Sequence, residues 1–499
     1  MKKRILCLLL ACLLLTGCTT PQEDAPPAAS LAASLPEEVA PAAPIGDAAL
    51  AYSATAALWL PSVDGQQLQT VYQTLSFTYS LHPAETILRA LLAHPGDERV
   101  SPASPVAVIP AGKNPVEVAG GVATVNLSAA AQELPRQALF TLCMAITATL
   151  CELPDVDYVN VLVGGRAVAM DESGWLPLGA QRLQAGQELP ILWEQLLARG
   201  VPEGTLPTSV PVTSTVTLYF PLADGSGIVP EARRVAFAGQ HPQQLVQGLL
   251  EALSAGADSR SGVSGLPDLI PLMTAAPEIT PLEDGSLRVT LRFTGDLRSW
   301  ITSCGSDPAC TFAAIVYTLT TYVPNLTQVC IFTGERGVTS VACPARGSIL
   351  FPGALHARAD YSSYLMAQCT LFAQADGLLT PQAASLPYRS VYSPRALLLA
   401  LPAGEGPGAV LPEPIADSDV LGLAVCDDTL LINLSARYAS VLRDAPEAQR
   451  LAACAIVNTM CRGLNVRRVR FFFDSAVPGP MGADTLWSGE FLYLPGLVR

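Results

Sequence analysis

Lysine is nearly absent from this 499-residue chain, because Lys113 is the only lysine beyond Lys2 and Lys3. Arginine does not restore the balance, since 29 basic residues face 43 acidic ones and the net charge is −14. A protein that binds nucleic acid needs a basic face to neutralise phosphates. The composition therefore excludes nucleic acid as a partner, and it disfavours adhesion of the folded part to an anionic membrane surface.

Motifs of catalysis and metal binding are also missing. Four histidines and no C-x-x-C pair leave no ligand cluster of the zinc type, and no G-x-S-x-G, H-E-x-x-H, P-loop or G-x-G-x-x-G pattern occurs. Glu152 and Asp155 are the pair that an acid–base interpretation suggests, but polar caps at a helix end are the more ordinary role. We expect no catalytic, metal-binding or cofactor-binding residue, no cofactor and no enzymatic activity, with an unrecognised hydrolase as the last-ranked alternative.

A membrane-spanning run is lacking as well. The unbroken apolar stretch from Ile5 to Leu15 has eleven residues, whereas about twenty are needed to cross a bilayer. Behind the basic head Met1–Arg4, this stretch is typical of a signal peptide. We therefore expect residues 1–17 to be removed, which takes away three basic residues and no acidic one and changes the net charge to −17.

The tetrapeptide Leu15-Thr16-Gly17-Cys18 resembles the lipobox of bacterial lipoproteins. The resemblance implies that Cys18 carries a diacylglycerol and becomes the new N-terminus, so the protein attaches to a membrane through its N-terminal lipid. Two acyl chains give stable anchoring where one gives marginal binding. The chain is then expected on the outer face of the cell membrane. An ordinary secretory signal is the alternative interpretation.

Residues 18–54 are rich in Ala, Pro and acidic residues and lack a long apolar period. Such a stretch buries too little surface to offset the entropy of ordering it, so it is predicted to be an extended tether. The remainder exceeds one ordinary core and is expected to form several domains.

A pattern of segments occurs three times, with corresponding points 140 to 170 residues apart. Each copy opens with a short apolar strand followed by an Asp-Gly turn, which favours a hairpin. A helix that begins with proline follows, because the first turn tolerates the missing N–H. The strands are "ALWLP" from Ala57, "TLYFP" from Thr217 and "CTLFA" from Cys369, and the helix entries are His82-Pro83, His241-Pro242 and Ser393-Pro394. The third copy has Ser393 where the other two have histidine, and serine is a poor substitute for a metal-binding histidine. We therefore interpret these residues as helix-entry residues rather than as metal ligands.

The second half of each copy predicts paired strands, a strongly apolar helix and a last strand. The strands "VATVNLS", "LRVTLRFT" and "TLLINLS" correspond, so Asn126 and Asn433 stand where the middle copy has Arg292. A catalytic or ligating residue does not tolerate that exchange, and we interpret the position as architecture, followed by a Ser or Thr that caps the next segment. Asn126-Leu127-Ser128 also matches a glycan acceptor, a pattern that arises readily by chance.

The predicted fold is α+β, with three tandem two-layer domains, each a mixed β-sheet covered by two helices in the order β-β-α-β-β-α-β. The predicted parts are a tether at 18–54, domains at 55–180, 215–342 and 367–499, a linker with a short helix at 181–214, and a linker at 343–366.

Ten cysteines remain beyond Cys18. Cys143 with Cys151, and Cys454 with Cys461, are spaced along predicted helices at more than about 10 Å, beyond the roughly 7 Å limit for a disulfide. They are expected to be core thiols. The segment between Cys304 and Cys310 is short enough for a disulfide, and that pairing stays open.

At these segments the sequence resembles the GerMN domain of sporulation and spore-germination lipoproteins. The resemblance is carried by "TLYFP", "PQQLVQGLLEALSAG", "VATVNLS" and "IVYTLTTYVPNLTQVCIFTGE". The third block departs most from the pattern, and the middle block lacks the asparagine. The resemblance implies a non-enzymatic envelope lipoprotein of sporulation or germination, whose domains serve as assembly or scaffold modules for envelope proteins.

The alternative function is a lipoprotein that binds peptidoglycan or a small solute. Trp193 and Trp487 are the aromatic candidates for stacking on sugars. Packing of connecting segments onto the domains is the competing role for both tryptophans.

Overall fold

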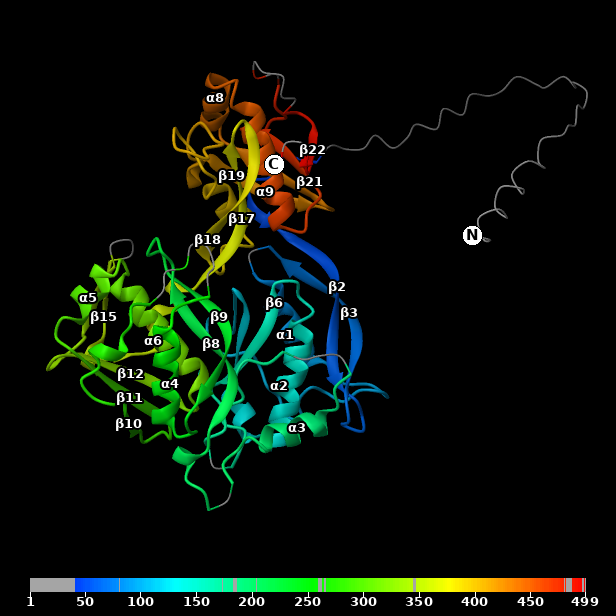
Figure 1. Ribbon diagram of the computed structural model, residues 1–499. Helices are drawn as coiled ribbons and strands as arrows, with labels where there is room; N and C mark the ends of the chain where they lie inside the picture. Colours follow the sequence, from blue (N-terminus) through cyan, green and yellow to red (C-terminus); the bar gives the residue numbers. More distant parts are fainter. Residues whose placement is uncertain are drawn as a thin grey trace, which may run out of the picture. The chain divides into compact units, whose positions relative to one another are not determined.

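The computed structural model describes residues 41–499, apart from residues 80, 173, 183–185, 203, 259–262, 264–265, 344–346, 480, 482–486, 496–497 and 499 (Figure 1). Cys18, the predicted signal peptide and most of the predicted tether lie outside the described residues. Residues 43–499 form one compact body. In the part that the structure describes, no helix combines the length and the apolar character needed to cross a membrane.

The same order of elements occurs three times, in modules that we number along the chain. The first module contains β2 (Ala51–Pro61), β3 (Leu68–Thr78), α1 (Pro83–Ala93), β4 (Val116–Ala119), β5 (Gly121–Leu127), α2 (Arg136–Leu150), β6 (Val156–Val163) and β7 (Arg166–Ala167). The second contains β8 (Val212–Pro221), β9 (Ile228–Phe237), α4 (Pro242–Ser254), β10 (Glu278–Pro281), β11 (Leu287–Phe293), α5 (Leu297–Ser303), α6 (Pro308–Tyr322), β12 (Leu326–Thr333) and β13 (Arg336–Gly337).

The third module contains β17 (Met366–Ala375), β18 (Leu378–Pro387), α7 (Pro394–Leu399), β19 (Val420–Cys426), β20 (Thr429–Leu434), α8 (Ala436–Asp444), α9 (Gln449–Gly463), β21 (Arg468–Phe473) and β22 (Glu490–Leu492). Between the modules lie α3 (Leu189–Leu197), β14 (Ser340–Cys343), β15 (Gly347–Leu350), β16 (Leu355–His356) and the 3-10 helix η5 (Arg358–Tyr364). The α+β class is confirmed. The predicted order β-β-α-β-β-α-β occurs in each module, with an extra helix (α5 or α8) before the apolar helix of the second and third modules and a further strand (β7, β13 or β22) at the end of each.

Each module divides its strands between a hairpin and a separate mixed sheet. The opening strands form separate two-stranded sheets, β2-β3, β8-β9 and β17-β18. The mixed sheets have the orders β4-β5-β6-β7, β10-β11-β12-β13 and β19-β20-β21-β22, and the strands on either side of the second helix are parallel in all three. The hairpins are therefore not part of the mixed sheets, although the sequence pattern gave no indication of this division.

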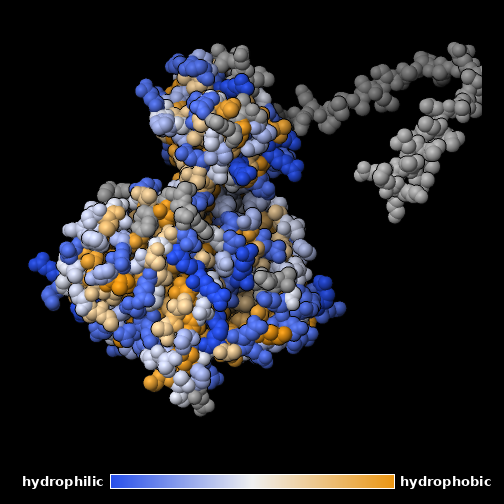
Figure 2. Space-filling model, viewed as in Figure 1, coloured by the Kyte–Doolittle hydropathy of each residue, from blue (hydrophilic) through white to orange (hydrophobic). Residues whose placement is uncertain are grey.

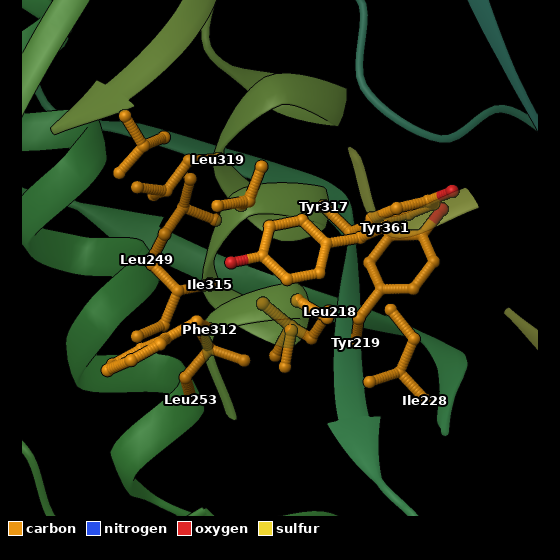
Figure 3. Packing of buried hydrophobic residues seen from close by; sticks show 14 of the residues in the cluster. Leu218, Tyr219, Ile228, Leu249, Leu253, Phe312, Ile315, Tyr317, Leu319 and Tyr361 are labelled. Atoms are coloured by element: carbon orange, nitrogen blue, oxygen red, sulfur yellow. The ribbon is translucent and has the colours of Figure 1, made fainter. Parts of the chain in front are cut away.

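The apolar second helix of each module packs against both the opening hairpin and the mixed sheet: α2 contacts β2 and β6, α6 contacts β8 and β12, and α9 contacts β17 and β21. A helix covered on two sides needs apolar residues around most of its circumference. In Figure 3, Phe312, Ile315 and Leu319 of α6 lie beside Leu249 and Leu253 of α4, which covers a further side.

One hydrogen bond recurs in every module and joins the second helix to the hairpin. A backbone N–H of the first hairpin strand donates to a threonine hydroxyl on the helix. The pairs are Trp59 with Thr149 at 2.9 Å, Tyr219 with Thr318 at 3.0 Å, and Phe372 with Thr459 at 3.2 Å. Phe372 is therefore the structural counterpart of Trp59 and Tyr219. Aligning "CTLFA" with the other two opening strands places Leu371 at this position, so the sequence alignment of the third strand is wrong by one residue.

The N-terminal part of the described chain joins the third module. Strand β1 (Gly46–Ala49) pairs in parallel with β19 and extends that sheet. The Asn433 side-chain amide donates to the Pro44 carbonyl at 2.8 Å, and Arg395 binds the Asp47 carboxylate through two hydrogen bonds of 2.7 and 2.9 Å. The expectation that the tether runs to residue 54 is wrong for its last part, because β1 and the start of β2 lie there.

The segment predicted as a linker at 343–366 is also built into a module. Strand β16 pairs with β12, and Phe351, Tyr361 and Tyr364 belong to the hydrophobic core of the second module. Its aromatic side chains bury large areas of apolar surface, which stabilises their packing on that core.

Candidate functional site

Asn126 and Asn433 have the same structural role in the first and third modules. The Oδ1 atom of Asn126 accepts a hydrogen bond from the Gly165 N–H at 2.7 Å, and that of Asn433 accepts from the Ser475 N–H at 3.0 Å. Gly165 and Ser475 both have positive φ, in the turn after the last parallel strand. Each asparagine therefore fixes a tight turn, which confirms the architectural interpretation.

In the middle module, Arg292 stands at the position of these asparagines and makes a different contact. The Arg292 guanidinium lies over the Phe332 ring, 4.6 Å from its centroid. The predicted cap that follows the strand forms only in the third module, where the Ser435 hydroxyl accepts from the Tyr438 N–H at 3.2 Å. The Ser128 hydroxyl instead accepts a hydrogen bond from the Ile109 N–H at 3.3 Å and does not cap the segment that follows it.

The helix-entry interpretation of the His-Pro and Ser-Pro pairs is confirmed. His82 Nδ1 accepts from the Ala84 N–H at 3.0 Å, His241 Nδ1 accepts from the Gln243 N–H at 3.3 Å, and Ser393 Oγ accepts from the Ala396 N–H at 3.3 Å. Each side chain satisfies one of the N–H groups that a helix leaves unpaired at its start. Within the described residues, His, Cys, Asp and Glu side chains form no group suited to a metal ion.

The helix-capping role expected for Glu152 and Asp155 is not observed, because their carboxylates bind side chains elsewhere. Glu152 accepts a hydrogen bond from the Trp59 indole N–H at 2.9 Å. Asp155 accepts from His82 Nε2 at 3.0 Å and from the Tyr392 hydroxyl, which links the first module to the start of the third. Burial raises the pKa of the Asp155 carboxyl, but these hydrogen bonds outweigh it and lower the pKa overall.

The remaining sequence-derived candidates have packing roles. Trp193 of α3 packs on Phe140 with ring centroids 5.3 Å apart, and the buried Trp487 indole donates to Gln449 at 3.0 Å. The partly buried Trp193 therefore packs a connecting segment onto the first module, and the buried Trp487 offers no sugar-stacking surface. No disulfide joins Cys304 to Cys310; Cys304 is exposed and Cys310 is buried, donating to the Gly225 carbonyl at 3.3 Å.

A buried ion pair lies between the first two modules, at residues that no sequence motif indicates. Arg358 of η5 donates to Glu117 of β4, to the Tyr219 hydroxyl at 3.3 Å and to the Thr321 hydroxyl at 2.6 Å. Its guanidinium also lies 3.9 Å from the centroid of the Tyr317 ring. A buried ion pair needs such additional partners to offset its desolvation, so this cluster fixes the two modules in one arrangement.

The electrostatics of this cluster keep the Arg358 guanidinium charged. Burial lowers the pKa of Arg358, but the Glu117 carboxylate and the adjacent tyrosines raise it above its usual range. Burial, and then Glu117, raise the pKa of Tyr317, so its hydroxyl stays protonated and donates to Glu117 at 3.4 Å. No motif foretells the pairing of Arg358 with Glu117, because 241 positions separate them.

A cavity of about 530 Å³ opens beside this cluster, at the contact between the first module, the second module and η5. Its lining includes Glu117, Thr124 and Asn126 from the first module, Tyr317, Thr320 and Thr327 from the second, Arg358 and Ser362 from η5, and the loop residues Lys113 and Asn114. Small-molecule sites in proteins usually have about 300–1,000 Å³. The cavity is therefore the candidate functional site.

A second polar contact supports the same boundary. The Asn160 side chain donates to the Thr217 hydroxyl at 2.8 Å, and the Thr124 and Tyr219 hydroxyls lie 3.4 Å apart. Because Asn160 and Thr217 are both buried, a lost partner would leave an unpaired polar group. The buried polar groups of the two modules thus satisfy one another across the boundary.

Comparison with known proteins gives one family match and several structural neighbours. The family model described as "Germane: Sporulation and spore germination" matches residues 58–169, the greater part of the first module. No curated protein sequence matches the chain.

The structural neighbours include the tandem GerMN domains of the sporulation protein GerM from Bacillus subtilis, which are 19% identical over 57% of this chain and 92% of that chain, with a TM-score of 0.21. The first GerMN domain of the same protein is 18% identical over 27% of this chain and 97% of that chain, with a TM-score of 0.20. The family match connects residues 58–169 of this chain with the Germane family of sporulation and spore germination.

Proposed function

We propose that this protein is a non-enzymatic lipoprotein of the cell envelope, in which the three modules bind partner proteins of a sporulation or germination complex. The match of residues 58–169 to the Germane family is the observation that carries the proposal. The domains are proposed at 55–180, 215–342 and 367–499, adjusted by the structure to include β1 in the third sheet and β16 in the second.

The buried contacts between modules support a scaffold role. The Arg358–Glu117 cluster and the Asn160–Thr217 contact hold the first two modules in a fixed relation. Hydrophobic residues appear at several separate places on the face shown in Figure 2. Exposed examples along the chain include Tyr72 in β3, Leu350 in β15 and Leu492 in β22. A rigid body with dispersed contact points suits simultaneous binding of several partners.

Anchoring is proposed to occur through a lipid on Cys18 and the tether that follows it. The test is a fluorescently tagged full-length chain in a sporulating cell, expected at the septum or the forespore membrane during sporulation. The variant Cys18→Ala is expected to lose the membrane fraction while the folded body stays intact, and it serves as the matched control for anchoring. Diffuse localisation of the parent protein throughout sporulation would overturn the assembly proposal.

Binding of peptidoglycan or a small solute is the second candidate function, favoured by the cavity of about 530 Å³. The full-length protein would then sediment with purified peptidoglycan or show a ligand-induced rise in melting temperature. Failure of both measurements would remove this candidate without affecting the localisation test.

A further inference from the structure

The charges around the cavity do not cancel. Arg358 and Glu117 neutralise each other through their hydrogen bond, and both side chains are largely buried, with 15% and 9% exposed. Lys113 is the remaining charged residue of the lining. The cavity therefore carries one excess positive charge, in a chain whose net charge is −14. Because the protein as a whole is negatively charged, it does not attract anions over a long distance. An anion is bound at this cavity through its short-range contact with the local cation.

Three polar side chains at the cavity have no protein partner in the part of the chain that the structure describes. They are the Lys113 ammonium, the Asn114 amide and the Ser362 hydroxyl, for which no hydrogen bond or ion pair occurs among the described residues. Together they supply donors for a carboxylate and both donors and acceptors for neighbouring polar groups. Ala357 and Ala359 supply small apolar side chains in the same lining.

The loop that carries Lys113 is held in place from two sides. Asn126 donates from its side chain to the Ala111 carbonyl at 3.2 Å, and the Ala111 N–H donates to the Asn126 backbone carbonyl at 2.8 Å. Arg389, which follows β18, donates to the Lys113 carbonyl at 2.7 Å. The backbone of this wall is thus fixed while the Lys113 side chain is exposed, an arrangement that reduces the entropy cost of binding.

We propose that this cavity binds a small monoanionic ligand that carries one carboxylate beside hydroxyl or amide groups. Lys113 pairs with the carboxylate, Asn114 and Ser362 bind the neutral polar groups, and the Ala357 and Ala359 side chains contact the apolar part of the ligand. Asn126 acts as a positioning residue through the loop. This inference rests on the ligand-binding candidate, and a failed localisation test would leave it standing.

The first experiment compares two sugars that differ by one carboxylate group. N-acetylmuramic acid is the probe, and N-acetylglucosamine, which lacks the lactyl carboxylate, is its uncharged counterpart. Titration calorimetry on the full-length protein is expected to detect N-acetylmuramic acid, with N-acetylglucosamine at least about tenfold weaker, the equivalent of ~1.4 kcal/mol. Inorganic phosphate tests a bare anion. Binding of phosphate as tight as that of N-acetylmuramic acid would overturn the proposal.

Variants of the exposed lysine test the assigned contact without disturbing the core. Lys113→Gln is expected to weaken binding of N-acetylmuramic acid about tenfold, because it removes a charge-assisted hydrogen bond. Lys113→Arg is expected to retain most of the affinity. Arg467→Gln removes an exposed cation elsewhere and is the matched control. Equal affinities for Lys113→Gln and the parent chain would contradict the assignment.

The scarcity of lysine allows a direct test of occupancy. Lys113 is the only lysine beyond residue 3, so an amine-reactive reagent such as acetic anhydride modifies one lysine side chain of the folded part. Mass spectrometry of the peptide containing Lys113 is expected to show several-fold slower acetylation with N-acetylmuramic acid than with N-acetylglucosamine. Identical rates in the two sugars would overturn the placement of the ligand at Lys113.

Discussion

Arg358 joins Glu117 across the boundary between the first two modules, with the Tyr317 ring beneath the guanidinium at 3.9 Å. The ion pair is shielded from water on both sides, since each of its members is largely buried. The relation between the two modules thus depends on a contact whose members belong to different parts of the chain.

Removing the cation alone is expected to destabilise the protein strongly. Arg358→Met leaves the Glu117 carboxylate buried without its partner, a change that costs about 3–5 kcal/mol when a buried pair is broken. Urea unfolding of the full-length chain, followed by tryptophan fluorescence, measures the loss. The double variant Arg358→Met with Glu117→Gln is expected to recover part of it, because no uncompensated charge remains. Unchanged unfolding of Arg358→Met would contradict a structural role for the pair.

The recurring helix-to-hairpin hydrogen bond offers a second test. Thr318→Val keeps the shape of the side chain and removes the acceptor for the buried Tyr219 N–H. The unpaired N–H is expected to cost about 1–3 kcal/mol in the free energy of unfolding. Thr213→Val, at an exposed position of β8, is the control and is expected to change stability little. A smaller loss in Thr318→Val than in the control would show that this contact does not stabilise the module.

The two corresponding asparagines are expected to differ in their contribution. Asn433→Ala removes side-chain bonds to Ser475 and Pro44 from a position with 0% exposure. Asn126→Ala removes bonds to Gly165 and Ala111 from a half-buried position, where water replaces part of the loss. Thermal unfolding is expected to show a loss of about 1–3 kcal/mol for Asn433→Ala and a smaller one for Asn126→Ala. The opposite order would contradict this ranking.

Acid is expected to destabilise the second module through His356. Burial lowers the pKa of His356 to about 4 from its usual 6.5. The neutral ring is stacked on Phe351 and accepts a hydrogen bond from the Tyr361 hydroxyl at 2.7 Å. Between pH 6.5 and 4 the unfolded chain binds the proton more readily, so the free energy of unfolding falls as pH falls through this window.

Measuring unfolding by urea at pH 7 and at pH 4.5 checks this expectation. His356→Phe is expected to show a smaller loss between the two values, because the titrating group is gone. His94→Gln, at a half-buried position in the first module, leaves His356 in place and is expected to follow the parent protein. An acid-induced loss in His356→Phe equal to that of the parent would rule out His356 as its source.

The N-terminal strand is expected to detach when its ion pair is removed. Asp47→Asn takes away the charge that receives both hydrogen bonds from Arg395. Limited proteolysis is then expected to cleave near residues 43–50 faster, by several-fold, because β1 has only four residues to hold it on β19. Asp417→Asn changes the other, more exposed carboxylate at Arg395 and is the control. Equal cleavage in both variants would contradict the role of Asp47.

The local elements of the fold followed from the sequence because their causes are local. Proline after His82, His241 and Ser393 marked the helix starts, and Asp-Gly turns such as Asp376-Gly377 marked the hairpins, where Asp376 and Gly377 both have positive φ. The architectural role of Asn126 followed from comparison of the copies. No local signal indicated that the hairpins separate from the mixed sheets, since strand pairing depends on which edges meet in space.

The sequence does not predict the candidate cavity, because its wall also depends on which parts of the chain meet in space. Its wall combines Lys113 from a loop, Tyr317 from α6 and Ser362 from η5, and no motif connects these residues in the sequence. The sequence pattern predicts a linker for the segment that contains Ser362, whereas its tyrosines pack into the second core. Likewise, Gly46 and Asp47 lie in an Ala- and Pro-rich stretch whose composition predicts a tether, whereas the edge of β19 recruits them into a strand.

The sequence by itself determined the order of strands and helices in each module, the entry residues of the helices and the excess of acidic residues, because propensity, periodicity and composition act over a few neighbouring positions. The tertiary structure alone decided that Arg358 pairs with Glu117, that β1 completes the third sheet and that a positively charged cavity opens between the first two modules. These features require residues distant in the chain to be desolvated together, and only the packed surfaces determine which charges and polar groups then face one another.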